Sequence, residues 1–127
     1  MNALLLPYIF NILVLLPIGL PLLFGGPVAV RRVFQAKFTD SEGIRTILGS
    51  LWTAILVGSV VGLFFPVAMS PLLLVQIIYK SLWLLVFVLP RLFLGRRNEV
   101  PWGVAGTFLF IVMTYPWVIP WRVLFGG

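Results

Sequence analysis

Long apolar runs separated by short polar stretches dominate the chain. The runs cover residues 3–24, 46–65, 72–94 and 102–123 and contain few charged side chains. A helix needs about 20 residues to cross a hydrocarbon core roughly 30 Å thick. A transmembrane barrel would alternate apolar and polar residues, whereas these runs are apolar all round. The pattern therefore predicts an all-α integral membrane protein, a four-transmembrane-helix bundle that forms a single transmembrane domain over residues 1–127.

A shorter amphipathic segment, at residues 28–38, follows the first run. Its apolar side chains fall on one helical stripe, and its arginines fall largely off that stripe. This arrangement favours a short helix that lies in the cytoplasmic membrane interface with its cations at headgroup level. The apolar stripe consists of Val30, Val33, Phe34 and Phe38.

The polar stretch TDSE, residues 39–42, has the pattern of a capping box, with Thr39 as the N-cap and Glu42 three residues later. It predicts the start of a helix that continues into the second span. Acidic side chains near a helix N-terminus also suit the helix macrodipole. Asp40 and Glu42 are therefore expected to have a structural role and not to form a catalytic carboxylate pair.

Basic residues are concentrated in the two loops that follow the first and third runs. The positive-inside rule places these loops in the cytoplasm and both termini outside it, in a cell (inner) membrane. The net charge of +6 flanks apolar spans and forms no soluble basic face, so nucleic acid is not an expected partner. The residues expected to anchor the chain to the anionic headgroups of the bilayer are Arg31, Arg32, Lys37, Arg45, Arg96 and Arg97.

Several kinds of chemistry are excluded by the residue types that the chain lacks. It has no histidine and no cysteine, so haem and zinc sites of the usual kinds and Ser–His or Cys–His nucleophiles are absent. No acidic residue lies within a span, although many ion-coupled pumps use one. No glycine-rich phosphate loop is present. We therefore expect no catalytic residue, no cofactor and no metal site, and not an enzyme.

Lys80 is the exception within the apolar pattern, because it lies near the middle of the third run. A lysine at the centre of a membrane helix costs about 2.5–3.5 kcal/mol on insertion scales. Gln76, Lys80 and Trp83 are spaced to share one helical face, and Tyr79 flanks it. These four residues form the most polar patch in any span and are the candidate site for a partner, ligand or lipid.

Three interpretations of Lys80 remain open from the sequence. The side chain snorkels to the interface; it pairs with an acid, carbonyl or headgroup supplied by another subunit or by lipid; or it meets an anionic ligand or transported substrate. No acid in the spans of this chain can neutralise it. Polar residues of other spans that could meet it inside the bundle are Asn11, Ser50, Thr53, Ser59, Thr107 and Thr114.

Two further patterns concern packing. Gly58 and Gly62 form a G-x-x-x-G pair, which permits close approach of membrane helices within the bundle or in a dimer. Trp83 is deep in its span, where a cation–π contact with Lys80 is possible. The other tryptophans are near span ends, as in the aromatic belts of membrane proteins. They are Trp52, Trp102, Trp117 and Trp121.

The expected function follows from the membrane helices and the unpartnered lysine. We expect a non-catalytic accessory or structural subunit of a larger membrane complex, with protein partner subunits or a homo-oligomer. The alternative is a small transporter, channel or lipid- or anionic-ligand-binding protein that uses Gln76, Tyr79 and Lys80. In that alternative, the prolines of the first span, which predict a kink or break, would contribute to the pathway.

Overall fold

The computed structural model describes residues 3–126, and this part of the chain is all-helical. Three of its helical units are long and apolar enough to cross a membrane. The third unit is continuous across a π-helical turn. The three units are α1 (Leu5–Phe24), α3 (Glu42–Phe64), and α4 (Pro71–Trp83) with η1 (Leu84–Val88) and α5 (Leu89–Phe93).

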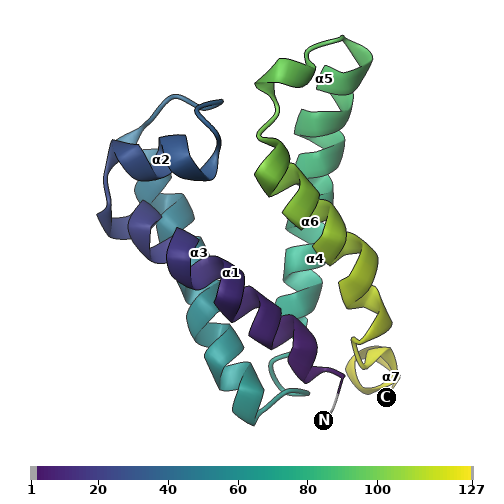
Figure 1. Cartoon of the computed structure of the whole chain (residues 1–127). Coiled ribbons are helices and arrows are strands. Elements are labelled where there is room, and N and C mark those ends of the chain that lie inside the picture. Colours follow the sequence, from purple (N-terminus) through teal and green to yellow (C-terminus); the bar gives the residue numbers. More distant parts are fainter. Residues whose placement is uncertain (1–2, 127) are drawn as a thin grey trace.

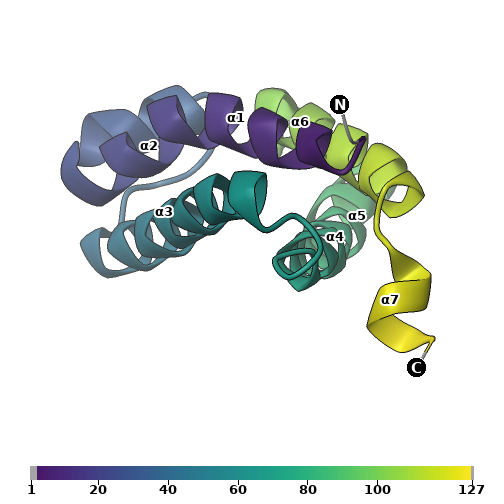
Figure 2. The same ribbon diagram turned by 90° about the horizontal axis from the view of Figure 1, so that it is seen from below.

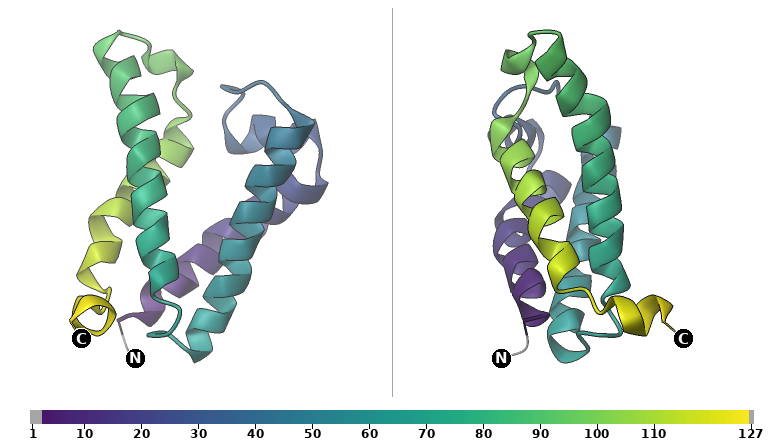
Figure 3. Two further views of the ribbon diagram at one scale, coloured as in Figure 1. Left: turned by 180° about the vertical axis from the view of Figure 1, so that it is seen from behind. Right: turned by 90° about the vertical axis from the view of Figure 1, so that its right-hand side faces the viewer.

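The helices form two antiparallel hairpins, in which α1 packs on α3 and α4 packs on α6 (Figure 1). The hairpins lie close together at one end and diverge towards the other, as the view from behind also shows (Figure 3, left). Seen from below, α1 and α6 form one layer and α3 and α4 the other (Figure 2). The remaining elements are α2 (Pro27–Val33), η2 (Arg97–Glu99), α6 (Trp102–Thr114), η3 (Tyr115–Trp117) and α7 (Trp121–Phe125).

The elements at the two ends of the molecule differ in charge. The start of α1, the turn at residues 65–70 and α7 lie at the end where the hairpins converge (Figure 1). The helix α2 and the segment around η2 lie at the diverging end, which we call the basic end. All six residues expected to anchor the chain lie on α2, in the loop after it, in the first turn of α3, or on and just before η2.

The fourth predicted span, residues 102–123, is not one continuous helix. The helix α6 ends at Thr114, and Pro116 and Pro120 follow within six residues. Proline lacks the N–H for the hydrogen bond to the carbonyl four residues earlier, and its ring crowds that carbonyl. At 1.5 Å per residue, α6 is about 20 Å long, less than the hydrocarbon core. The described residues therefore contain three helices of spanning length, one fewer than predicted.

Prolines affect the other spans less than expected. The first span was predicted to be kinked or broken; it is not broken, because α1 is continuous through Pro17 and Pro21. In the third unit, the π-helical turn η1 directly precedes Pro90, and the N–H of Leu89 donates to the carbonyl of Leu84, five residues earlier. Single π-helical turns often occur near functional sites. This one begins four residues after Lys80.

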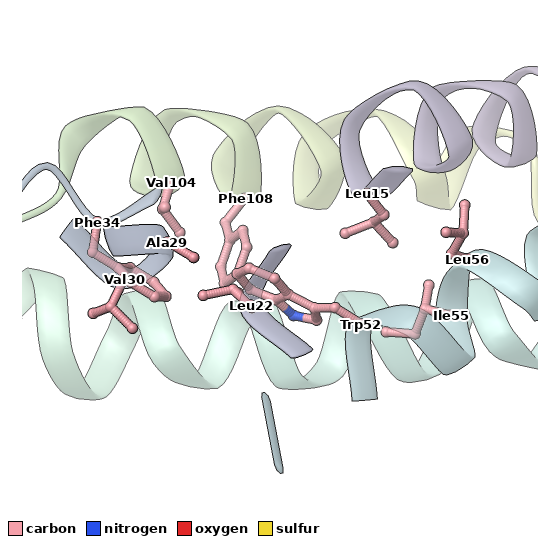
Figure 4. Packing of buried hydrophobic residues seen from close by; sticks show 10 residues of the cluster. All are labelled: Leu15, Leu22, Ala29, Val30, Phe34, Trp52, Ile55, Leu56, Val104 and Phe108. Atoms are coloured by element: carbon pink, nitrogen blue, oxygen red, sulfur yellow. The ribbon is translucent and has the colours of Figure 1, made fainter. Parts of the chain in front are cut away.

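The segment at residues 28–38 is only partly helical. The helix α2 ends at Val33, and Gln35 and Ala36 then adopt positive φ angles of 56° and 61°. The apolar stripe packs on protein and not on lipid, because Val30 and Phe34 are buried in the core. Figure 4 shows them in one cluster with residues of α1, α3 and α6. The stripe therefore packs on the protein core, and the placement of this segment in the membrane interface stays a prediction.

The capping-box prediction is also wrong. The helix α3 begins at Glu42 with Ser41 as its N-cap, and no side chain caps its N-terminus. Asp40 instead accepts two hydrogen bonds from Arg45, at 2.7 and 2.8 Å. The Asp40 carboxylate is a structural group, as expected, but it neutralises Arg45 and does not cap the helix.

Glycines allow α1 and α3 to pack closely. A Cβ atom on Gly49 would lie 2.6 Å from the backbone nitrogen of Leu23, so only glycine fits there without moving a helix. Gly62 lies against the ring of Tyr8, where a Cβ would be 2.5 Å from a ring carbon. Gly58 faces a flexible side chain of the other hairpin, Leu72. The G-x-x-x-G pair is thus used within the chain, with one member in the α1–α3 contact.

The loop between α5 and α6 is held by an exposed ion pair. Arg96 donates to both carboxylate oxygens of Glu99, at 2.5 and 2.6 Å. These hydrogen bonds lower the pKa of Glu99 below its ordinary value. A carboxylate with a lowered folded-state pKa contributes stability above the pKa of the unfolded state and loses it as the pH falls through the folded-state value.

We therefore expect Glu99→Gln to be less stable than the native chain at neutral pH and equally stable at strongly acidic pH. The effect is small, because both partners are exposed and solvent screens the pair. Thermal unfolding in detergent micelles across this pH range measures it. Glu42→Gln is the matched control, since Glu42 forms no ion pair within residues 3–126. An equal pH dependence for both variants would contradict the assignment.

Candidate functional site

Lys80 projects from α4 into the interior, and only 2% of the residue is exposed. Its ammonium donates a hydrogen bond of 3.2 Å to Oε1 of Gln76, one helical turn earlier. The ammonium nitrogen is 4.8 Å from the ring centroid of Phe108 and 5.0 Å from that of Tyr79. A snorkelling lysine would reach the surface, so this conformation is a buried one. The facing helix α6 supplies the ring of Phe108 for this cation–π contact. Trp83, the residue suggested by the sequence, lies on the same helix as Lys80.

The site has more donors than acceptors. The ammonium of Lys80 has three N–H groups, and the one hydrogen bond it donates within residues 3–126 is to a neutral amide. Gln76 is fully buried, and its Nε2 has no partner in that range. None of the three acids of the chain, Asp40, Glu42 and Glu99, pairs with Lys80. A buried cation without a counter-charge is unfavourable, so the site lacks a negatively charged acceptor.

Lys80 lines a cavity of about 440 Å³ between the two hairpins, which we call the lysine cavity. This volume is within the range of about 300–1,000 Å³ that ligand pockets occupy. The wall is mainly apolar and comes from α1, α2 and α6, with Trp52 from α3. No acid lines it. The polar and charged residues that line it are Asn11, Arg32, Gln35, Lys80 and Thr107.

Arg32 gives the lysine cavity a second positive charge. It lies on α2 at the basic end, is exposed, and forms no ion pair within residues 3–126. The cavity therefore has one cation at its basic end and one buried cation, Lys80, deeper along α4. In this mainly apolar cavity the buried ammonium of Lys80 acts on a ligand with little screening by solvent, whereas the exposed charge of Arg32 is screened. The electrostatic field of this cavity favours an anion.

A second cavity of about 280 Å³ lies on the other side of a wall that includes Trp52, Val104 and Phe108. It is lined by Arg45, whose charge is already neutralised by Asp40. The predicted patch is therefore divided between two cavities. Lys80 lines the first, Tyr79 and Trp83 line the second, and Gln76 lines neither but contacts Lys80.

Polar residues from other spans surround the converging end of the lysine cavity. Nδ2 of Asn11 donates to Oγ of Ser59 at 3.0 Å, and the hydroxyl of Tyr115 donates to Oδ1 of Asn11 at 2.5 Å. Of the polar residues predicted to meet Lys80, Asn11 and Thr107 line its cavity. The others do not line it: Ser59 bonds to Asn11, Thr114 bonds to its own helix, the hydroxyl oxygen of Thr53 is buried without a hydrogen-bond partner within residues 3–126, and Ser50 is exposed.

Trp52 belongs to the site, although its position predicted an aromatic belt. It is 4% exposed, lines both cavities, and donates from Nε1 to the hydroxyl of Tyr79 at 3.2 Å. The remaining belt candidates, Trp102, Trp117 and Trp121, are exposed. Arg32 and Gln35 were missed as site residues. No sequence signal places them at the cavity, because their positions depend on α2 folding back over the hairpins.

Comparison of the chain with protein-family models, with curated proteins and with solved structures finds no significant match. Within residues 3–126 no group of three or more His, Cys, Asp or Glu side chains is placed to hold a metal ion. The functional proposal therefore rests on the geometry and charge of the lysine cavity.

Proposed function

We propose that this protein binds an anionic ligand inside the membrane, in the lysine cavity, with Lys80 as its direct partner. The observation that supports the proposal is the environment of Lys80. The residue is 2% exposed, has a neutral amide as its hydrogen-bond acceptor within residues 3–126, and lines a cavity of ligand size. An anion in this cavity would supply the negative charge that the chain does not provide.

The energetic reason is the unbalanced charge. Hydrogen bonds to a charged group contribute about 1.5–3 kcal/mol each, and Lys80 has donors in excess of its one described acceptor. Binding of an anion satisfies these donors and neutralises the buried cation in one step. Arg32, at the basic end of the same cavity, attracts anions towards it. Binding is therefore expected to depend on the charge of the ligand more than on its shape.

Two functions are consistent with such a cavity, and both are non-catalytic. The protein is a small transporter or a lipid- or anion-binding membrane protein, with Gln76, Tyr79 and Lys80 at or beside the cavities. Tyr79 orients the shared wall through its hydrogen bond with Trp52, and Gln76 orients the ammonium. The ligand is held by side chains that offer no nucleophile–base pair.

An accessory or structural subunit of a larger membrane complex is the second candidate. The observation in its favour is that a partner's acid would neutralise Lys80 as well as a ligand would. Because Lys80 is 2% exposed in the single chain, that acid would have to enter the cavity from a partner helix or loop. A flat interface of partner subunits or of a homo-oligomer would not reach the ammonium.

We further propose that α6 and η3 complete a fourth crossing of the inner membrane. The start of α1 and α7 lie at the same end of the molecule, as an even number of crossings would place them (Figure 1). The cations of the basic end favour the cytoplasmic side for that end, where they contact anionic headgroups. Both ends of the chain then lie outside the cytoplasm.

Single-cysteine labelling tests this orientation in a chain that has no native cysteine. Val67→Cys lies in the exposed turn at the converging end, and Asn98→Cys lies in η2 at the basic end. We expect a membrane-impermeant maleimide to label the cysteine at 67 in intact cells, and the cysteine at 98 after the membrane is opened. The reverse pattern would contradict the orientation, and equal labelling of both in intact cells would contradict the crossing by the α4–α5 unit that separates them.

Native mass spectrometry after mild-detergent extraction tests the binding function. We expect the native chain to retain an anionic small molecule or lipid, and Lys80→Met to lose it. Lys37→Met is the matched control, because Lys37 is the other lysine of the chain and is exposed on the loop after α2. A co-purifying protein that Lys80→Met loses, with no bound small molecule in the native chain, would favour the accessory-subunit function instead. If the native chain retains neither a small molecule nor a protein, both functions are overturned.

A further inference from the structure

We propose that the ligand of the lysine cavity is a single-chain amphiphile with one anionic headgroup, a long-chain carboxylate. It enters from the bilayer between α1 and α6 and places its carboxylate against the ammonium of Lys80. This inference rests on the proposed anion-binding function and names the class of anion. Three features of the cavity carry it: its wall, its opening and its charge.

The wall of the cavity suits an alkyl chain. Apolar side chains from α1 and α6 face each other across it, among them Leu15, Ile18, Val104 and Ile111. Burial of each methylene group against such a wall favours binding. A small hydrated anion such as inorganic phosphate would lose its water there and find few hydrogen-bond donors in return. The wall therefore selects an anion that carries its own apolar surface.

The cavity is accessible along α1 as well as at the basic end. Pro17 on α1 is an exposed residue of its lining, as are Arg32, Gln35 and Gly103 at the basic end. The helices α1 and α6 form one layer of the fold (Figure 2) and expose large apolar side chains beside the cavity. These side chains are Leu13 and Leu16 on α1 and Leu109 and Phe110 on α6. A ligand dissolved in the bilayer can reach the cavity sideways between these helices.

Side-chain contacts lie near both ends of the cavity. At the converging end, Phe10 and Phe110 pack with their ring centroids 5.1 Å apart, and Asn11 bonds to Tyr115. At the basic end, Oε1 of Gln35 accepts a hydrogen bond of 3.0 Å from the backbone N–H of Gly103. This bond joins the loop after α2 to the start of α6 and narrows direct access from the aqueous side. Arg32 and Gln35 remain exposed at the basic end, so the lateral route between α1 and α6 is part of the proposal.

The charge of the cavity fits a headgroup with one negative charge. Lys80 is the one buried cation that lines it, and the neutral side chains of Asn11 and Thr107 are the other polar groups along α1 and α6. A carboxylate neutralises Lys80 with no excess charge left in the apolar enclosure. Arg32 lies at the basic end and stays with the headgroups of the interface, where it attracts the amphiphile to this side of the bilayer.

Quenching of Trp52 by brominated stearate tests the proposal, because Trp52 lines the cavity and is buried. The four other tryptophans are replaced by phenylalanine, and the protein is reconstituted in phosphatidylcholine vesicles. We expect saturable quenching in this single-tryptophan chain. Adding Lys80→Met should weaken the apparent affinity for brominated stearate at least about tenfold. Adding Lys37→Met should leave that affinity unchanged. Should the reporter chain not fold, the difference in quenching between the native chain and Trp52→Phe gives the same signal.

Three further probes decide between the ligand classes. Equal quenching by a brominated fatty alcohol overturns the role of the charged headgroup. Saturable quenching by brominated phosphatidylglycerol, with none by stearate, overturns the single-chain class. If inorganic phosphate alone shifts the Trp52 emission in a Lys80-dependent manner, the amphiphile is wrong and the anion-binding function stands. If no probe binds in a Lys80-dependent manner, both proposals are overturned.

Discussion

Lys80→Met is expected to make the ligand-free protein more stable while it weakens anion binding by about 10- to 100-fold. Lys80 is a buried cation with a neutral amide as its acceptor, and apolar replacements of buried charged groups are often neutral or stabilising, by about 1–4 kcal/mol. Methionine has a similar length and flexibility and fills the same space. The weaker binding reflects one lost charge-assisted interaction of about 1.5–3 kcal/mol.

Thermal unfolding in detergent micelles, with and without stearate, measures both effects on one sample. The native chain is expected to gain stability when stearate is added, since the ligand binds the folded state. Lys80→Met is expected to begin higher and to gain little. The control Lys37→Met should behave as the native chain in both conditions. A ligand-free Lys80→Met that is less stable than the native chain by more than about 1 kcal/mol would show that the contacts with Gln76 and Phe108 make Lys80 structural.

The opposite signs of these two effects are what distinguish a functional residue from a structural one. A residue that breaks the local pattern and lowers stability persists where function requires it. In α4, Lys80 interrupts an apolar helix, and its neighbour Gln76 leaves a buried Nε2 without a partner within residues 3–126. Both departures from an apolar core lie at the lysine cavity or directly beside it.

The length and composition of the apolar runs were enough to predict α1, α3 and the α4–α5 unit, because a membrane helix depends on these local properties. They also singled out Lys80, since one charge in such a run needs no tertiary information to be noticed. The end of α6 was not predicted from the apolar run, because apolar residues resume at Val118 and Ile119 after Tyr115 and Pro116. There the covalent geometry of proline decides the outcome and not the burial of apolar surface.

The rest of the site depends on tertiary packing and left no sequence signal. The sequence alone assigns Arg32 to the anchoring cations. It lines the cavity because α2 folds back over the hairpins. Trp52 lies near the expected end of the second span, but α3 begins at Glu42, four residues before that span, and Trp52 packs inside. Phe108 is one apolar residue among many in α6, and only the facing helix makes it the partner of Lys80.

The largest expected loss of stability comes from Gly49→Ala, at about 2 kcal/mol. The added Cβ would lie 2.6 Å from the backbone nitrogen of Leu23 and 2.8 Å from its Cα, so a helix must move. Overpacking of a tight contact typically costs about 1–3 kcal/mol, and here the obstacle is backbone that cannot rotate away. The better helix propensity of alanine, about 1 kcal/mol, offsets part of that cost.

Gly43→Ala is the matched control on the same helix, because no atom lies within 4 Å of a Cβ at that position. It should be neutral or more stable by up to about 1 kcal/mol, the gain in helix propensity. Gly58→Ala should fall between the two, since the side chain of Leu72 can move aside. Unfolding of each variant by increasing SDS in mixed micelles measures this order of stability.

This order distinguishes the structure from the simpler G-x-x-x-G interpretation, which assigns the close contact to Gly58 and Gly62 and gives Gly49 no role. If Gly49→Ala is as stable as Gly43→Ala, α1 and α3 do not approach as closely as described. The lysine cavity depends on that contact, since α1 supplies much of its wall while α3 supplies Trp52. A helix displaced at Gly49 should therefore also weaken stearate binding, even though the substituted residue lines neither cavity.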